Sequence, residues 1–128
     1  MKPSRRTLLM LLPLCALAPA QAQPAASVPL EAAREALAGG RVRVIDIREP
    51  SEHAAGVAAG AQLLPMSQLQ QRQAELPDKD LPVLLICRTQ NRSKATALKL
   101  REAGYRQVQY VEGGMSEWVK RGWPTRQP

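Results

Sequence analysis

A cysteine at the end of an apolar run is the strongest candidate for chemistry in this sequence. Cys87 follows the run Pro82–Ile86, and after it come a polar loop and a helical pattern over Lys94–Ala103. A short apolar run with β-branched residues, followed by a 3.6-residue period, indicates a buried strand that leads into a helix. Cys87 is therefore predicted at the carboxyl end of a strand, where open α/β sheets place their ligands.

The residues after Cys87 are suited to stabilise a thiolate. A loop that enters a helix gathers backbone N–H groups and partial positive charge, and Arg88, Arg92 and Lys94 add cations. A free thiol has a pKa of about 8.5, which such surroundings lower. A shift of about two units needs about 2.7 kcal/mol, more than a helix terminus supplies alone, so we expect the arginines and loop amides to contribute. The alternative is a small buried hydrophobic residue.

Residues 1–22 have the three-part pattern of an export signal. A basic start is followed by the apolar stretch Leu8–Ala18 and by Ala20-Gln21-Ala22, whose small residues suit a signal peptidase. We expect cleavage after Ala22 and a single mature domain, residues 23–128, in the periplasm or outside the cell. Either the general secretory or the twin-arginine route fits. The apolar stretch is short for a membrane span and contains a proline, so no stable membrane anchor is expected.

The composition of the mature chain narrows the function classes. The signal holds three of the 18 basic residues and none of the 11 acidic ones, which leaves 15 against 11, a net charge of +4. The chain has no Phe and 3% aromatic residues, so nucleic-acid binding is not expected. A modest positive charge suits small anionic substrates. Because cleavage removes Cys15, Cys87 has no cysteine to pair with, and one histidine with one cysteine excludes a structural zinc site.

Strand and helix patterns alternate along the mature chain. Strands are predicted at residues 42–47, 60–65, 82–86 and 107–111. Helices are predicted at residues 29–39, 50–55, 67–76, 94–103 and 115–121; the first ends at Gly39-Gly40, and Ser67 is the capping residue of the third. The mixed apolar pattern of 42–47 indicates burial on both faces of a sheet. Right-handed crossovers then produce an α/β fold, with a mainly parallel sheet covered by helices on both faces.

Charged residues near the end of the strand 42–47 are further candidates. Asp46 and Arg48 lie there, and charged residues at strand ends more often satisfy loop amides and each other than act in catalysis. We therefore favour a supporting role for both. His53 has no partner in the sequence and is expected to be a surface or packing residue.

Two features near the last helix leave alternatives open. Trp118 follows Met115 at helical spacing, which favours core packing over a role as a substrate platform. Gly113 and Gly114 either let the backbone approach the Cys87 loop closely or form a simple turn.

Three motifs together resemble the rhodanese family of sulfurtransferases. They are Val44–Pro50 with Glu52, Cys87–Ser93, and Glu112–Met115 with Trp118. The resemblance implies a five-stranded parallel sheet flanked by helices. It also implies that Cys87 takes sulfur from a donor such as thiosulfate, holds it as a persulfide and passes it to cyanide or a thiol. The chain has Gln90 where the family often has glycine, and Gly56–Ala61 replaces its frequent Gly-His-Ile-Pro-Gly-Ala motif.

This resemblance assigns roles within the second motif. Cys87 attacks the outer sulfur of an anionic donor, and the loop amides with Arg88 and Arg92 hold the departing group. This chemistry needs no metal and no organic cofactor, and its partners are a small anionic sulfur donor and a thiophilic acceptor, with a protein acceptor left open. The expected substrate-binding residues are Arg88, Thr89, Gln90, Asn91, Arg92 and Ser93.

Two other functions stay open. Phosphatases and arsenate reductases of a related fold class use Cys-x5-Arg, but Ser93 stands at the arginine position and Arg92 comes one residue earlier. This spacing disfavours phosphoryl chemistry. A non-enzymatic module that carries a persulfide, or senses oxidants through Cys87, would use the same thiolate.

Overall fold

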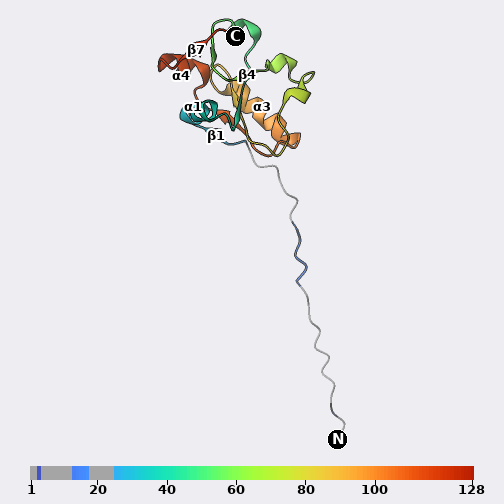
Figure 1. Ribbon diagram of the computed structural model, residues 1–128. Coiled ribbons are helices and arrows are strands. Elements are labelled where there is room, and N and C mark those ends of the chain that lie inside the picture. Colours follow the sequence, from blue (N-terminus) through green and yellow to red (C-terminus); the bar gives the residue numbers. More distant parts are fainter. Residues whose placement is uncertain (1–2, 4–12, 18–24) are drawn as a thin grey trace.

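A five-stranded parallel sheet forms the centre of the fold (Figure 1). The structure is a computed structural model that describes residues 3, 13–17 and 25–128. The predicted export signal, residues 1–22, lies largely outside the described residues. In the described ranges, no helix has the length and apolar character needed to cross a membrane.

The strand that precedes Cys87 is the middle strand of the sheet. All neighbouring strands are parallel, and Ile86, the last residue of this strand, pairs with Asp46, the last residue of its neighbour, so the carboxyl ends of the two strands meet at one edge of the sheet. The predicted parallel sheet is confirmed. In spatial order the strands are β1 (Ser27–Val28), β6 (Val108–Val111), β5 (Val83–Ile86), β2 (Arg43–Asp46) and β4 (Gln62–Leu63).

Helices cover both faces of the sheet, as predicted (Figure 1). They are α1 (Leu30–Gly39), α2 (Pro50–His53), α3 (Asn91–Glu102) and α4 (Gly114–Lys120). Along β5, Leu84 and Ile86 pack in the core shared with α1 and α4, whereas Val83 and Leu85 pack in the core shared with α3. This alternation explains why the strand is apolar throughout: both of its faces are buried.

Segment 66–76 is not the helix that the sequence predicted. It forms two 3₁₀ turns, η1 (Met66–Gln68) and η2 (Gln73–Glu75). Ser67, the predicted capping residue, instead donates from its N–H and hydroxyl to the carboxylate of Glu49 at 3.1 and 2.6 Å. Arg72 donates to the carbonyl oxygen of Leu63 at 3.4 Å. These contacts with distant residues override the helical preference of the segment, because tertiary contacts outweigh local propensity.

Further differences from the prediction concern the start of one helix and strands of two residues, among them β1. Helix α3 begins at Asn91 rather than at Lys94, so the last residues of the predicted loop form its first turn. A separate antiparallel pair, β3 (Val57–Ala58) and β7 (Thr125–Arg126), was not predicted. Strands of two residues are too short to carry an alternating pattern that sequence analysis can detect.

Candidate active site

The sulfur of Cys87 lies at the amino-terminal end of α3. The residue is 1% exposed and contacts Ser93 in the first turn of that helix. The Ser93 N–H donates to Cys87 Sγ at 3.4 Å, and the thiol donates to Ser93 Oγ, also at 3.4 Å. Ser93 Oγ donates onward to the carbonyl oxygen of Gln90 at 3.1 Å. The sulfur therefore lies where helix N–H groups and the helix dipole favour negative charge.

The start of α4 holds the backbone that follows β5. The N–H groups of Met115 and Ser116 donate to the carbonyl oxygens of Cys87 and Arg88, both at 2.8 Å. Gly114 has a φ of +59°, and a Cβ on it would lie 2.4 Å from the Cys87 carbonyl oxygen. Only glycine fits such a close approach in this conformation. The sequence left open whether the glycine pair forms a simple turn or lets the backbone approach the Cys87 loop closely; Gly114 allows the close approach.

The remaining loop residues have distinct positions. The side-chain oxygen of Gln90 accepts the N–H of Gly113 at 3.1 Å, so Gln90 ties the loop to the turn before α4. The carbonyl oxygen of Thr89 faces Gly114, and Asn91 opens α3; both residues are exposed. Gln90 thus fixes the loop with its side chain at the position where the family often has glycine.

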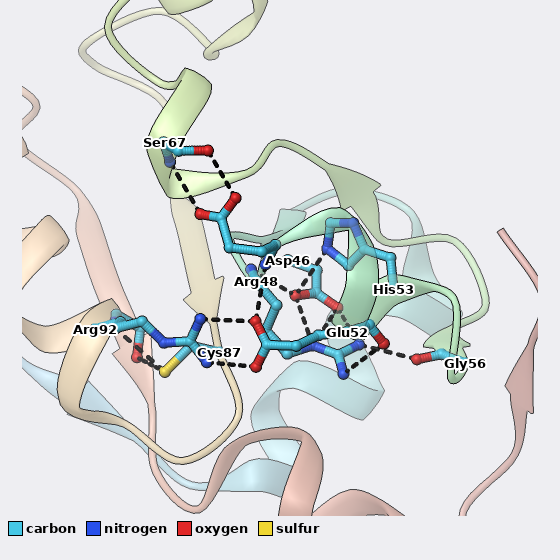
Figure 2. Close-up of polar contacts among 10 residues, drawn as sticks. Asp46, Arg48, Glu52, His53, Gly56, Ser67, Cys87 and Arg92 are labelled. Atoms are coloured by element: carbon cyan, nitrogen blue, oxygen red, sulfur yellow. Dashed lines mark hydrogen bonds and ion pairs between the residues drawn. The ribbon is translucent and has the colours of Figure 1, made fainter.

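Arg92 is bound by a carboxylate from a distant part of the chain. Its two Nη atoms donate to both oxygens of Glu52 in α2, at 2.8 and 2.7 Å (Figure 2). The bonds from Arg92 lower the pKa of Glu52 to about 2, and the same pairing raises the pKa of Arg92. Glu52 also accepts the N–H of Glu49 at 2.9 Å, in a capping box at the start of α2. The sequence motif included Glu52, but nothing local indicated Arg92 as its partner.

Asp46 and Arg48 form a buried ion pair behind this site. Arg48 donates to the Asp46 carboxylate from its backbone N–H, Nε and Nη2, the last at 2.7 Å, and Nη2 also donates to the carbonyl oxygen of Gly56 at 2.9 Å (Figure 2). The pair therefore ties the end of β2 to the end of α2. His53 is buried, as a packing residue would be; its Nε2 lies 3.4 Å from Asp46 Oδ1 but makes no hydrogen bond within the described residues.

Trp118 belongs to the core rather than to a substrate surface. Its side chain is 3% exposed, packs edge-on against Trp123 and donates from Nε1 to the carbonyl oxygen of Pro124 at 3.1 Å. The prediction of core packing for Trp118 is therefore confirmed.

An open pocket of about 370 Å³ lies beside the Cys87 loop. Its lining includes Arg48, Glu52, Arg88, Met115, Ser116 and Val119. Arg88 is the predicted loop residue that faces this pocket, and it is exposed. In the part of the chain that the structure describes, no three His, Cys, Asp or Glu side chains gather in an arrangement for a metal ion.

Sequence comparison assigns the chain to a family. A model of the rhodanese-like domain matches residues 29–121. The chain belongs to the rhodanese-like domain family. A sulfurtransferase of Allochromatium vinosum is 37% identical over 87 residues, which cover 68% of this chain and 80% of that protein. The Bacillus subtilis protein YqhL is 38% identical over 78 residues, and the match spans 61% of this chain and 61% of the Bacillus protein.

Solved rhodanese-fold structures have the same arrangement of helices and strands. A human single-domain sulfurtransferase has a TM-score of 0.65 at 27% identity, covering 77% of this chain and 97% of that one. The polysulfide-sulfur transferase homodimer of Wolinella succinogenes has a TM-score of 0.67 at 25% identity, covering 80% and 79%. This rhodanese-like domain thus has sulfurtransferases among its homologues.

Proposed function

We propose that this rhodanese-like domain is a sulfurtransferase of the thiosulfate type. Cys87 takes a sulfane sulfur from thiosulfate or a persulfide donor and passes it to cyanide or a thiol. The observation that supports this proposal is the position of Cys87 Sγ, which accepts the Ser93 N–H at 3.4 Å at the start of α3. A helix terminus stabilises the negative charge of a thiolate and of a persulfide alike.

The proposed reaction has two halves. In the first, the Cys87 thiolate attacks the outer sulfur of thiosulfate, an S–S bond forms, and the S–S bond of thiosulfate breaks as sulfite leaves with the electron pair. In the second, the acceptor attacks the outer sulfur of the persulfide, and Cys87 leaves as a thiolate. Both halves conserve atoms and electrons without a metal or an organic cofactor.

The chain supplies three kinds of group to this chemistry. The Ser93 N–H and the helix dipole favour the anionic sulfur, the loop backbone is fixed by α4, and Arg88 supplies an exposed guanidinium to the pocket beside the loop. Such preorganised charge stabilises developing negative charge without further rearrangement.

Replacement of Cys87 by serine tests the function. We expect Cys87→Ser to abolish sulfur transfer from thiosulfate to cyanide, while thermal unfolding stays cooperative because the change is small. Turnover near the wild-type rate would exclude Cys87 as the sulfur carrier. A wild-type protein that loads one sulfur atom and then stalls with every small acceptor would instead be a persulfide carrier.

The thiosulfate assay, run beside an aryl phosphate assay, distinguishes a sulfurtransferase from a phosphatase. The arginine position of Cys-x5-Arg is filled here by Ser93, whose buried hydroxyl lies 3.4 Å from Cys87 Sγ, so a neutral group stands where phosphoryl transfer needs a cation. Hydrolysis of an aryl phosphate, with no activity on thiosulfate, would reverse our assignment.

We also propose that the mature protein works in the periplasm or outside the cell. This proposal rests on the export pattern of residues 1–22. Intact-mass measurement of the exported protein is expected to give a chain that starts at or near Gln23. An exported form that keeps Met1 and needs detergent for extraction would contradict it.

A further inference from the structure

The pocket beside the Cys87 loop is placed to receive a reactant of the sulfur chemistry. Arg88, directly after Cys87, lines it, and so does Met115, whose N–H donates to the Cys87 carbonyl oxygen at 2.8 Å. Glu52 also lines it and binds Arg92 of the first turn of α3. A molecule in this pocket would therefore lie against the segment that carries the reactive sulfur.

Arg88 brings the uncompensated charge to this pocket. The other charged lining residues are paired: Arg48 binds Asp46 at 2.7 Å, and Glu52 binds Arg92 at 2.7 and 2.8 Å. Within the described ranges, no hydrogen bond or ion pair engages the guanidinium of Arg88, which is exposed. A guanidinium with all its donors available binds carboxylate and sulfonate groups strongly.

The rest of the lining favours a short hydrocarbon chain. Ala55, Met115 and Val119 form an apolar wall, and the Val119 side chain is 61% exposed although it is apolar. An alkyl chain gains free energy by covering such a surface, whereas a small hydrated anion does not. The combination of one cation and an apolar wall fits a molecule with an acidic group on a short alkyl chain.

We propose that this pocket binds the sulfur acceptor, and that the acceptor is a short alkyl thiol with a carboxylate or sulfonate group. The acidic group lies on Arg88 and the chain lies against Val119; this inference rests on the proposed sulfurtransferase function. The acceptor thiol gives its proton to solvent, and its thiolate attacks the outer sulfur of the Cys87 persulfide. The S–S bond to Cys87 breaks, Cys87 leaves as a thiolate, and the acceptor becomes the new persulfide.

The test compares two thiols that differ in charge, 2-mercaptoethanesulfonate and neutral 2-mercaptoethanol. The full-length protein is loaded with sulfur from inorganic polysulfide, loading is verified by intact mass, and single-turnover discharge is followed at several thiol concentrations. We expect Arg88→Gln to raise the half-saturating concentration of the sulfonate thiol about 10- to 100-fold. The half-saturating concentration of 2-mercaptoethanol should differ much less between Arg88→Gln and the wild type, because that thiol has no acidic group.

A second pair of variants tests the wall without touching the Cys87 loop. Val119→Glu puts a negative charge into the pocket that Arg88 lines, and Val119→Gln is its neutral match of equal size. We expect the half-saturating concentration of the sulfonate thiol to be about fivefold higher in Val119→Glu than in Val119→Gln. For 2-mercaptoethanol the two variants should give the same value.

Two results would overturn the inference while leaving the proposed function intact. In the first, Arg88→Gln slows sulfur discharge to both thiols equally. In the second, the two Val119 variants discharge their sulfur to the sulfonate thiol equally well. Either result counts only if the loaded wild type still transfers its sulfur to cyanide. A wild type that discharges to neither cyanide nor any thiol would instead contradict the proposed function itself.

Discussion

Replacement of Gly114 by alanine tests whether the contact between α4 and the Cys87 loop builds the site. An added Cβ would lie 2.2 Å from the Thr89 carbonyl oxygen and 2.4 Å from that of Cys87, at a φ of +59°. The left-handed conformation costs a non-glycine residue about 1–2 kcal/mol. Movement of the loop away from α4 also loses the two 2.8 Å hydrogen bonds donated by Met115 and Ser116, each worth about 0.5–1.5 kcal/mol. The expected loss of stability is about 2–5 kcal/mol.

Gly122→Ala is the matched control. Gly122 has a φ of +70°, but nothing lies within 4 Å of a Cβ built on it. The control therefore incurs only the conformational cost of about 1–2 kcal/mol. About 1 kcal/mol shifts the Tm of a domain of this size by about 4–8 °C, so we expect Tm to fall by about 8–40 °C in Gly114→Ala and by about 4–16 °C in Gly122→Ala.

The activity of the two glycine variants separates loop geometry from general stability. Both are assayed well below their own Tm, by the rate at which thiosulfate loads sulfur onto Cys87. We expect Gly114→Ala to load at least about tenfold more slowly, because a displaced loop moves the sulfur from its attacking position, and Gly122→Ala to load at the wild-type rate. Equal losses of stability together with equal loading rates would refute the view that this close approach holds the loop.

Two further predictions concern the carboxylates behind the site. Asp46→Asn leaves the buried Arg48 guanidinium without its carboxylate and should lower the free energy of unfolding, measured in urea, by about 3–5 kcal/mol. Asp80→Asn, at an exposed ion pair, should lower it by less than about 1 kcal/mol. Similar losses in the two variants would show that the buried pair contributes no more than the exposed one. Glu52 has a pKa of about 2 in the fold against an ordinary 4.5, so its pair stabilises the protein above about pH 4.5 and is lost as the pH falls towards 2. Between pH 6 and pH 3 the free energy of unfolding of the wild type should therefore fall by about 1–2 kcal/mol more than that of Glu52→Gln, a value reduced for the partial exposure of the pair. Parallel curves of unfolding free energy against pH would contradict this.

Local patterns in the sequence determined the strand that carries Cys87 and the elements around it. The apolar run that became β5 predicted a buried strand, and its side chains alternate between the two cores. The end predicted for the first helix at Gly39-Gly40 is correct, because Gly40 adopts a left-handed φ of +66° as its cap. Such features depend on residues within one strand or one helical turn, so neighbouring residues suffice to predict them.

Tertiary structure alone decided which polar side chains from distant parts of the sequence become partners. Nothing near Arg92 in the sequence indicated that Glu52 would bind it, and Ser67 bonds to Glu49 instead of capping the predicted helix. The choice between a turn and a close approach at Gly114 also depended on α4 lying against the Cys87 loop. These contacts follow from the strand order β1-β6-β5-β2-β4, which brings distant segments together. Hydrogen-bond partners are set by this spatial order, and no local period of the sequence encodes it.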